Sequence, residues 1–506
     1  MPLADGLGAY HRAIPCAAAS SPWFDEGLRL YYAFDLEGAE HAFRRAAQGG
    51  SCAIAAWGVA LALGHNLNVP AMPERRAAAR AALPAAAGSP AERGLVDALR
   101  ARYAGDDVAA RDRAYADAMR ALAARVPDDP DVAALTAEAL LDLRPFAQWS
   151  PKGEPAPETP ELVALLERGL RRWPDHPGLN HYYVHAMESS PHPERALAAA
   201  ERIGAMMPAA GHLVHMPSHI YLRVGRYAEA AEQNRKAIVA DRRWEEAGRA
   251  GPLYAMYPLH DHHFLWLATL VLGRAAEARA EADVLAAACA PAMLRAMPGM
   301  EPLLTAPVLT ALRFGEHQRL LTIPAPPASD EWPFAAGIWH FARARAHAAL
   351  GARDAARREL DALDALITAL PVAPVRMMGA NAAADVLRVA AGIARGDLLA
   401  RSGDVPGAER LLRDAVARED ALRYDEPPSW PLPARQVLGR VLLDARRHAD
   451  AAAIFEADLA AHPNDGWALL GLAAAWKGLG RPTGTVDARV RAAFAHADRM
   501  PSLSAL

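Results

Sequence analysis

The sequence predicts an all-α protein made of a long series of antiparallel helical hairpins. Hydrophobic residues make up 52% of the 506 residues but aromatic residues only 7%, because alanine, the strongest helix former, supplies much of the apolar fraction. No segment shows the alternation of apolar and polar residues that is typical of strands. A glycine also recurs five residues before an alanine at several places, as tightly turned helical hairpins require.

The hairpins can be followed from one end of the chain to the other. Near the start, the small and aromatic residues of one hairpin are Trp23, Gly27, Ala39, Phe43 and Ala46. Near the other end, the corresponding residues are Leu438, Gly439, Ala451, Phe455 and Pro463. Between them, a turn glycine and a packing alanine recur as the pairs Gly225 and Ala230, Gly273 and Ala278, Gly351 and Ala356, and Gly403 and Ala408.

This pattern resembles the tetratricopeptide-repeat superfamily, whose period is near 34 residues, over nearly the whole chain. The segments 179–186, 211–221 and 257–264 are also similar to a bacterial subfamily of uncharacterised tetratricopeptide proteins that carry histidines at these places. That subfamily usually has Asn at the position of Asp261. The resemblance implies a right-handed superhelix of roughly ten to twelve hairpins and assigns no activity.

We expect a single α-solenoid over residues 1–506. Residues 130–290 are predicted to hold histidine-rich repeats, residues 291–332 an irregular proline-rich connection, and residues 333–506 further tetratricopeptide-like repeats. The net charge of −4 excludes a broad basic face for nucleic acid or anionic lipid. Cys16, Cys52 and Cys289 have no CxxC spacing, so the sequence supports no disulfide and no thiolate metal site. We expect a cytoplasmic protein with no nucleic-acid or membrane partner.

The histidines are the unusual feature of the chain, since ten of the 19 lie between His176 and His263. In tetratricopeptide repeats the second, fifth, ninth and twelfth residues face the concave groove, and such spacings share one helix face. In three successive repeats these positions hold seven histidines and one glutamate, which we predict to bind metal: His181, His185, Glu188, His212, His215, His219, His260 and His263.

Two further carboxylates are weaker candidates. Glu138 lies one helix earlier, opposite His185 in the repeat frame. Asp261 either orients a neighbouring histidine or is an exposed residue at a helix start. The other histidines fall outside the stripe, among them His262 and His340, and we expect them to have structural or surface roles.

A nitrogen-rich ligand set without sulfur favours Cu, Fe or Zn over Mg or Ca. Seven histidines exceed the needs of one ion, so we expect two. One arrangement places an ion among His181, His185, His215 and His219 and a second ion among His212, His260 and His263. Glu188 is either a ligand or a base that takes a proton from metal-bound water.

The sequence therefore favours a metalloenzyme that acts on a small organic molecule, with oxidoreductase chemistry preferred. A zinc-dependent hydrolase is the alternative within this class. A scaffold that binds a peptide or protein partner without catalysis, or a protein for metal storage or sensing, remains open.

Overall fold

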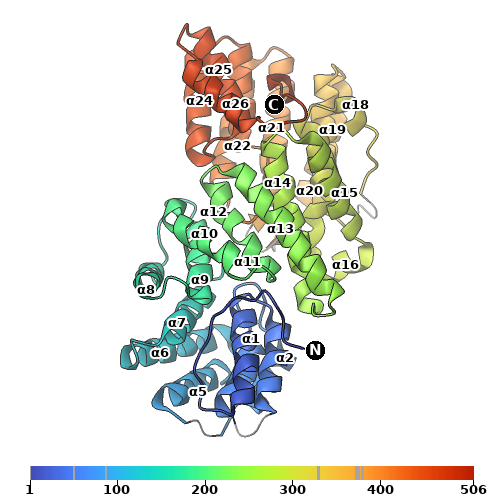
Figure 1. Cartoon of the computed structure of the whole chain (residues 1–506). Helices are drawn as coiled ribbons and strands as arrows, with labels where there is room; N and C mark the ends of the chain where they lie inside the picture. The colour runs from blue at the N-terminus through green and yellow to red at the C-terminus, as the bar shows by residue number, and fades with distance from the viewer. Residues whose placement is uncertain (1, 49–51, 86–87, 327–330, 371–375, 378–380) are drawn as a thin grey trace. The chain divides into compact units, whose positions relative to one another are not determined.

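Helices account for nearly all of the regular structure in the computed structural model (Figure 1), which describes residues 2–48, 52–85, 88–326, 331–370, 376–377 and 381–506. Among these residues, the strands β1 (Arg376–Met377) and β2 (Asn381–Ala382) form one short antiparallel pair with Arg376 opposite Ala382. The predicted all-α class is confirmed.

The chain divides into two compact units. Unit 1 comprises Met1–Tyr221 and Glu232–Asp261, and unit 2 comprises Leu222–Ala231 and His262–Leu506. The elements that lie wholly in unit 1 are η1 (Ala18–Ser20), α1 (Ser21–Tyr32), α2 (Leu36–Ala47), α3 (Ala53–Ala62), α4 (Pro73–Ala82), α5 (Pro90–Arg102), α6 (Val108–Arg125), α7 (Pro130–Asp142), α8 (Thr159–Arg172), α9 (Pro177–Glu188), η2 (Pro193–Ala196), α10 (Leu197–Met206), α11 (Gly211–His215) and η3 (Pro252–Ala255).

The boundaries between the units fall inside three helices, namely α12 (Pro217–Arg223), α13 (Tyr227–Glu246) and α14 (Met256–Val271). The remaining helices belong to unit 2: α15 (Ala275–Ala288), α16 (Pro291–Ala296), η4 (Pro298–Thr305), α17 (Ala306–Arg313), α18 (His317–Leu320), α19 (Pro333–Ala349), α20 (Arg353–Ala369), α21 (Ala383–Arg401), α22 (Val405–Asp420), α23 (Ala434–Asp444), α24 (His448–Ala461), α25 (Gly466–Gly478), α26 (Gly484–Ala493) and η5 (Leu503–Ala505). Residues 291–332, predicted to be irregular, thus contain short helices.

The predicted hairpin packing is present in both units. In unit 1, the buried ring of Phe43 on α2 lies so close to Gly27 on α1 that a Cβ atom there would come within 2.6 Å of it. In unit 2, Phe455 on α24 packs in the same way, and a Cβ at Gly439 on α23 would come within 2.5 Å of its ring. The prediction of tetratricopeptide-like helical hairpins is therefore confirmed at both ends of the chain.

Several hairpin turns use a backbone conformation with positive φ, five residues before the packing alanine. Glycine occupies this turn position in four repeats, at Gly225, Gly273, Gly351 and Gly403, with φ between 73° and 92°. Phe34 (φ 60°) and Arg446 (φ 57°) occupy it in two others. For a residue with a Cβ this conformation costs about 1–2 kcal/mol.

The N-terminal segment packs along unit 1. The Arg12 guanidinium lies 2.7 Å from Asp129 and 2.5 Å from Asp131, near the start of α7. Farther toward the N-terminus, the Gly6 carbonyl accepts a hydrogen bond of 3.0 Å from the amide of Ala209. These contacts join residues that are more than 100 positions apart in the sequence.

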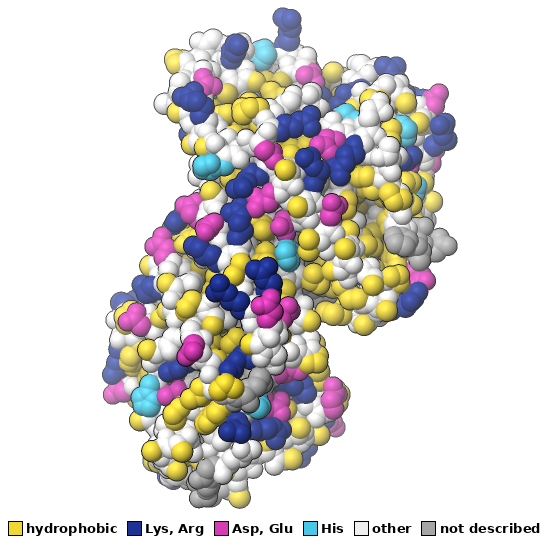
Figure 2. All heavy atoms as spheres, turned by 45° about the vertical axis from the view of Figure 1, so that its right-hand side comes forward, with side chains coloured by type: hydrophobic (Ala, Val, Ile, Leu, Met, Phe, Trp, Pro, Cys, Tyr) yellow, Lys and Arg dark blue, Asp and Glu magenta, His cyan; other side chains and the backbone are white. Residues whose placement is uncertain are grey.

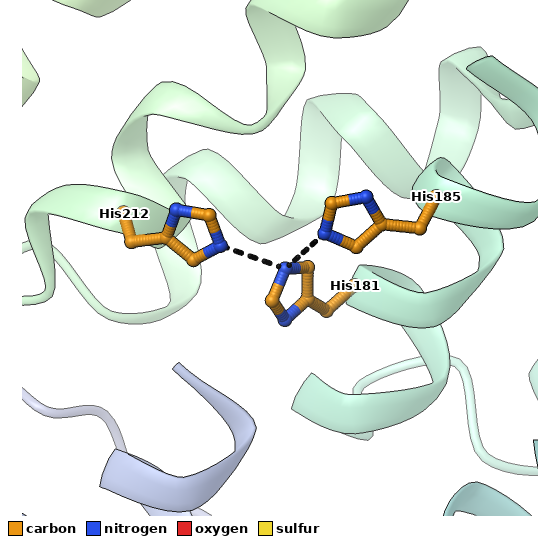
Figure 3. Close-up of side chains that lie close together, drawn as sticks. All are labelled: His181, His185 and His212. Atoms are coloured by element: carbon orange, nitrogen blue, oxygen red, sulfur yellow. Dashed lines mark hydrogen bonds between the residues drawn. The ribbon is translucent and has the colours of Figure 1, made fainter. Parts of the chain in front are cut away.

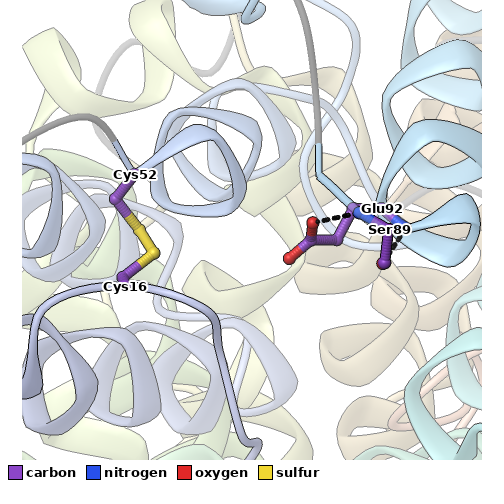
Figure 4. Close-up of a disulfide and its surroundings, with 4 residues drawn as sticks. All are labelled: Cys16, Cys52, Ser89 and Glu92. Atoms are coloured by element: carbon purple, nitrogen blue, oxygen red, sulfur yellow. Dashed lines mark hydrogen bonds between the residues drawn. A yellow bond between two sulfur atoms is a disulfide. The ribbon is translucent and has the colours of Figure 1, made fainter.

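The expectation that no disulfide forms is wrong. Cys16 and Cys52 are bonded across a sequence separation of 36 residues, with their Cα atoms 5.4 Å apart (Figure 4). CxxC spacing concerns cysteines that are close in the sequence, so its absence does not exclude this bond. The helical hairpin between Cys16 and Cys52 brings the two positions together. Disulfides of this kind persist in oxidising compartments and are rare in the cytosol.

Replacing Cys52 with Ser is expected to lower the free energy of unfolding by about 2–4 kcal/mol, because the bond restricts the unfolded chain over a long loop. The measurement is urea unfolding of both proteins with and without dithiothreitol. The wild type should lose stability on reduction, whereas the variant should not respond to the reductant. Equal stability of both proteins under oxidising conditions would contradict the prediction.

Among the described residues, no helix combines the length and the apolar character needed to cross a bilayer. Lys and Arg side chains are interspersed with Asp and Glu on the face shown in Figure 2. This mixture agrees with the nearly balanced charge of the sequence.

Candidate metal centre

Helices α9, α11, α12 and α14 carry the predicted histidines. Helix α9 begins with Pro177, and the His176 ring accepts a hydrogen bond of 3.2 Å from the amide of Leu179, which caps the helix. Every residue of α9 is buried. Helix α11 ends at His215 and α12 begins at Pro217, whose missing N–H interrupts a continuous helix.

Three histidines from α9 and α11 form the first histidine group, defined as His181, His185 and His212. Their side chains point toward one another (Figure 3). The Nε2 atom of His181 lies 3.1 Å from the Nε2 atom of His185 and 3.1 Å from that of His212. All three side chains are at most 2% exposed. The group thus presents three ring nitrogens to one point in the interior of unit 1.

A second histidine group consists of His215, His219 and His260. The Nε2 atoms of His215 and His219 are 2.6 Å apart, and the His260 ring lies 4.8 Å from that of His215 between centroids. Within each group, the atoms that could bind metal all lie within 4.8 Å of one another. His215 and His219 are buried, whereas His260 is partly exposed.

In two rings of the first group the opposite ring nitrogen faces a hydrogen-bond acceptor, whereas the buried Nδ1 atom of His212 has no partner among the described residues. The Nδ1 atom of His181 lies 2.7 Å from the Tyr32 carbonyl oxygen, and that of His185 lies 3.1 Å from Oε1 of Glu188. A carbonyl or carboxylate oxygen can only accept, so Nδ1 carries the proton in both rings. The Nε2 atom of each ring is then the nitrogen available to bind a metal ion.

The second group shows the same arrangement. Glu188 uses its other oxygen, Oε2, to accept from Nδ1 of His219 at 2.9 Å. The Nδ1 atom of His215 faces Oδ1 of Asn234 at 2.6 Å and Oδ1 of Asp261 at 3.1 Å. One carboxylate, Glu188, therefore contacts both groups from the side away from their Nε2 atoms.

The buried surroundings keep three of the histidine rings neutral. Burial, reinforced by the neighbouring imidazoles, lowers the pKa of His181, His212 and His215 well below the usual value. Burial alone would raise the pKa of Glu188, but the contacts with His185 and His219 outweigh it and lower the pKa to about 2. His181, His212 and His215 are thus neutral in a centre that also holds one ionised carboxylate.

Two unprotonated Nε2 atoms repel each other at 3.1 Å, the separation of His181 and His185, unless a proton on one of them or a metal cation lies between them. Two nitrogens bound tetrahedrally to an ion at about 2.0–2.1 Å lie roughly 3.3 Å apart. The two 3.1 Å contacts of His181 in the first group are close to this separation, whereas the 2.6 Å pair in the second group would have to open. Both buried groups could hold a metal ion.

The two groups follow one rule, in which the fifth and ninth residues of one repeat meet the second residue of the next repeat. His181 and His185 meet His212 in this way, and His215 and His219 meet His260. This grouping differs from the expected arrangement, because His212 lies with His181 and His185, and His260 lies with His215 and His219. His263 is the fifth residue of the third helix, and Leu267 occupies the ninth position, so this helix offers no further pair.

Two candidates lie away from both groups. His263 belongs to unit 2, where its ring lies 5.6 Å from that of Trp266. Oε1 of Glu138 accepts a hydrogen bond of 2.5 Å from the Tyr31 hydroxyl. Neither residue joins a cluster of possible metal ligands among the described residues.

The other sequence expectations can be compared with the structure in the same way. The histidines of the first group are buried and do not line an open groove. Asp261 is fully buried, so it is not an exposed residue at a helix start, and burial and Asp241 raise its pKa well above the usual value. His262 and His340, expected to be structural, pair with Glu281 and Glu359.

Two aromatic residues lie against the first group, and sequence reasoning missed one of them, Phe34. The Phe34 ring lies 4.4 Å from the His181 ring, and the Tyr257 ring lies 4.5 Å from the His212 ring, between centroids. A signal for Phe34 was present, since it stands five residues before Ala39, where other repeats have glycine.

No protein-family model and no curated protein matches the chain. Among solved structures, the human IFIT1 dimer with m7Gppp-AAAA shares 13% identity, with 96% of this chain and 92% of that chain covered and a TM-score of 0.32. The APC/C hetero-tetramer Cut9-Hcn1 shares 12% identity, with 81% of this chain and 97% of that chain covered and a TM-score of 0.27. No ligand of either protein is carried over to this chain.

Proposed function

We propose that this protein binds two transition-metal ions, one in each histidine group, within a helical-repeat scaffold. The observation that carries the proposal is the pairing of buried Nε2 atoms whose rings already donate through Nδ1. Imidazole nitrogens suit Zn, Cu, Fe and Ni, and the absence of oxygen ligands in both groups disfavours Mg and Ca.

Glu188 positions both sets of ligands in this proposal. Its two oxygens accept from His185 and His219, so both are engaged on the Nδ1 side. Such outer contacts fix the tautomer and orientation of a ligating ring. We therefore assign Glu188 a positioning role, in preference to the role of ligand or general base that the sequence suggested.

An ion held by three imidazoles retains a position for an exogenous molecule. On this basis we propose a metalloenzyme acting on a small organic molecule, with oxidoreductase chemistry if the ions are Cu or Fe. Zinc in the same sites would support hydrolysis instead. The sequence also predicts that the helical scaffold could bind a peptide or protein partner, and this remains a prediction.

Metal analysis of the untagged full chain tests the proposal. We expect about two equivalents of transition metal per chain, and about one after His185→Ala or His219→Ala, because each substitution removes one ligand from one group. His192→Ala, whose side chain is 64% exposed, is the matched control and should retain both ions. A wild type that contains no transition metal, and whose melting temperature does not change on addition of Zn²⁺, Cu²⁺ or Fe²⁺, would overturn the proposal.

Metal identity also separates the two kinds of chemistry. Protein isolated with Cu or Fe is expected to show absorption bands that change on reduction with dithionite, whereas a zinc protein would show none. Zinc as the sole metal at full occupancy would exclude the redox assignment and favour the hydrolase.

A further inference from the structure

Phe34, like Arg446, has a large side chain at a turn position where four other repeats have glycine. The position has positive φ, and Phe34 adopts φ 60° there. The ring is also buried, with 2% of the residue exposed. A conformation that disfavours large side chains is thus kept at the one turn whose side chain reaches the first histidine group.

The ring of Phe34 contacts every member of that group. Its centroid lies 4.4 Å from that of His181, 5.5 Å from that of His212 and 5.7 Å from that of His185. It is nearly parallel to the His212 and His185 rings, with interplanar angles of 19° and 13°. An apolar ring therefore lies beside the ring nitrogens at which an ion would bind.

The backbone of this turn is fixed from both sides. The Tyr257 hydroxyl donates to the Phe34 carbonyl at 3.3 Å, and Asp35, the next residue, accepts 3.0 Å from the Trp244 indole N–H and 2.8 Å from the Gly38 amide. These contacts hold the turn in place and so direct the Phe34 ring onto the histidines.

The two histidine groups differ in access. All members of the first group are buried, whereas His260 gives the second group a partly exposed member. A molecule from solvent therefore reaches the second group more directly.

We propose that Phe34 closes the first histidine group, so that an ion bound there is shielded from water and substrate. This inference rests on the proposed two-ion function and deepens it: the substrate is handled at the second group, His215, His219 and His260. The ion in the first group exchanges slowly with solvent. It influences the substrate only through the ion in the second group. Phe34 is thus a positioning and excluding residue.

The test is metal release from the full chain loaded with two equivalents of Zn²⁺ and mixed with excess EDTA. We expect two phases in the wild type, and His181→Ala should abolish the slow one. Phe34→Gly, which suits the turn but removes the ring, should accelerate the slow phase at least tenfold and leave the fast phase unchanged.

Phe24→Ala is the matched control for loss of packing. Phe24 is also a fully buried aromatic residue of unit 1, and its ring packs against Phe43. If Phe34 acted only through stability, Phe34→Gly and Phe24→Ala would change both phases alike. That outcome, or a wild type with a single fast phase for both ions, would overturn the role of Phe34 while leaving the two-ion proposal intact. A wild type that binds none of Zn²⁺, Cu²⁺ and Fe²⁺ would overturn both.

Discussion

Replacing Arg102 with Met is expected to lower the free energy of unfolding by about 3–5 kcal/mol, because removing one partner of a buried ion pair leaves the other charge uncompensated. The Arg102 guanidinium is fully buried and lies 2.6 Å from Asp142. It also lies 4.5 Å above the Tyr115 ring. Urea unfolding of the wild type and the variant measures the loss. The control is Arg100→Met, an exposed arginine paired with Asp97, which should cost less than about 0.5 kcal/mol.

The loss in free energy of unfolding caused by Arg102→Met is expected to increase with pH. Burial raises the pKa of Asp142 to about 7 in the folded protein, although Arg102 opposes the rise. Without Arg102 the folded pKa rises further, so the variant keeps losing stability above pH 7, where the wild-type carboxyl is already ionised. The unfolding midpoints should therefore differ more at pH 8 than at pH 5. A deficit independent of pH would show that lost packing, and not charge, is responsible.

Glu188→Gln is expected to weaken the binding of both metal ions at once. The affinity for each should fall by about 10–100-fold, as is typical when an outer partner of a ligating histidine is removed. The amide keeps one acceptor oxygen, but its NH₂ group cannot accept from the second Nδ1–H. His185 and His219 therefore cannot both retain their partner. Competition with a chromophoric chelator measures the two affinities.

The matched control for Glu188→Gln is Glu194→Gln, an exposed carboxylate paired with the exposed His192. It should leave both affinities unchanged. If Glu188→Gln weakened one ion and left the other untouched, Glu188 would serve a single site, and the shared role proposed above would be wrong.

The helical hairpins could be predicted because their packing depends on side-chain size at fixed spacing. Phe43 requires a glycine opposite it, and Ala39 must be small for the two helices of the hairpin to approach. These requirements involve residues of a single hairpin, so they can be recognised from the spacing of residues in the sequence. The bond between Cys16 and Cys52 is different, because a separation of 36 residues leaves no local pattern.

The composition of the candidate site was partly predictable for the same reason. The repeat frame places His181 and His185 on one helix face, but it does not say which residue of the next helix meets them. That choice depends on how neighbouring helices cross, and it brings in His212. The orientation of each ring depends on acceptors such as the Tyr32 carbonyl, which no side-chain pattern reveals.

The contacts of the N-terminal segment constrain the order in which unit 1 can assemble during synthesis on the ribosome. The loop closed by Cys16 and Cys52 needs only the first hairpin. The Arg12 amide can already donate to Asp25 of the first hairpin, but the Arg12 guanidinium can pair with Asp129 and Asp131 only after these have been made. The Gly6 carbonyl can accept from the amide of Ala209 only after that residue has left the ribosomal tunnel. The N-terminal segment therefore completes its native contacts late, after the part of the chain that carries His181 and His185 has been made.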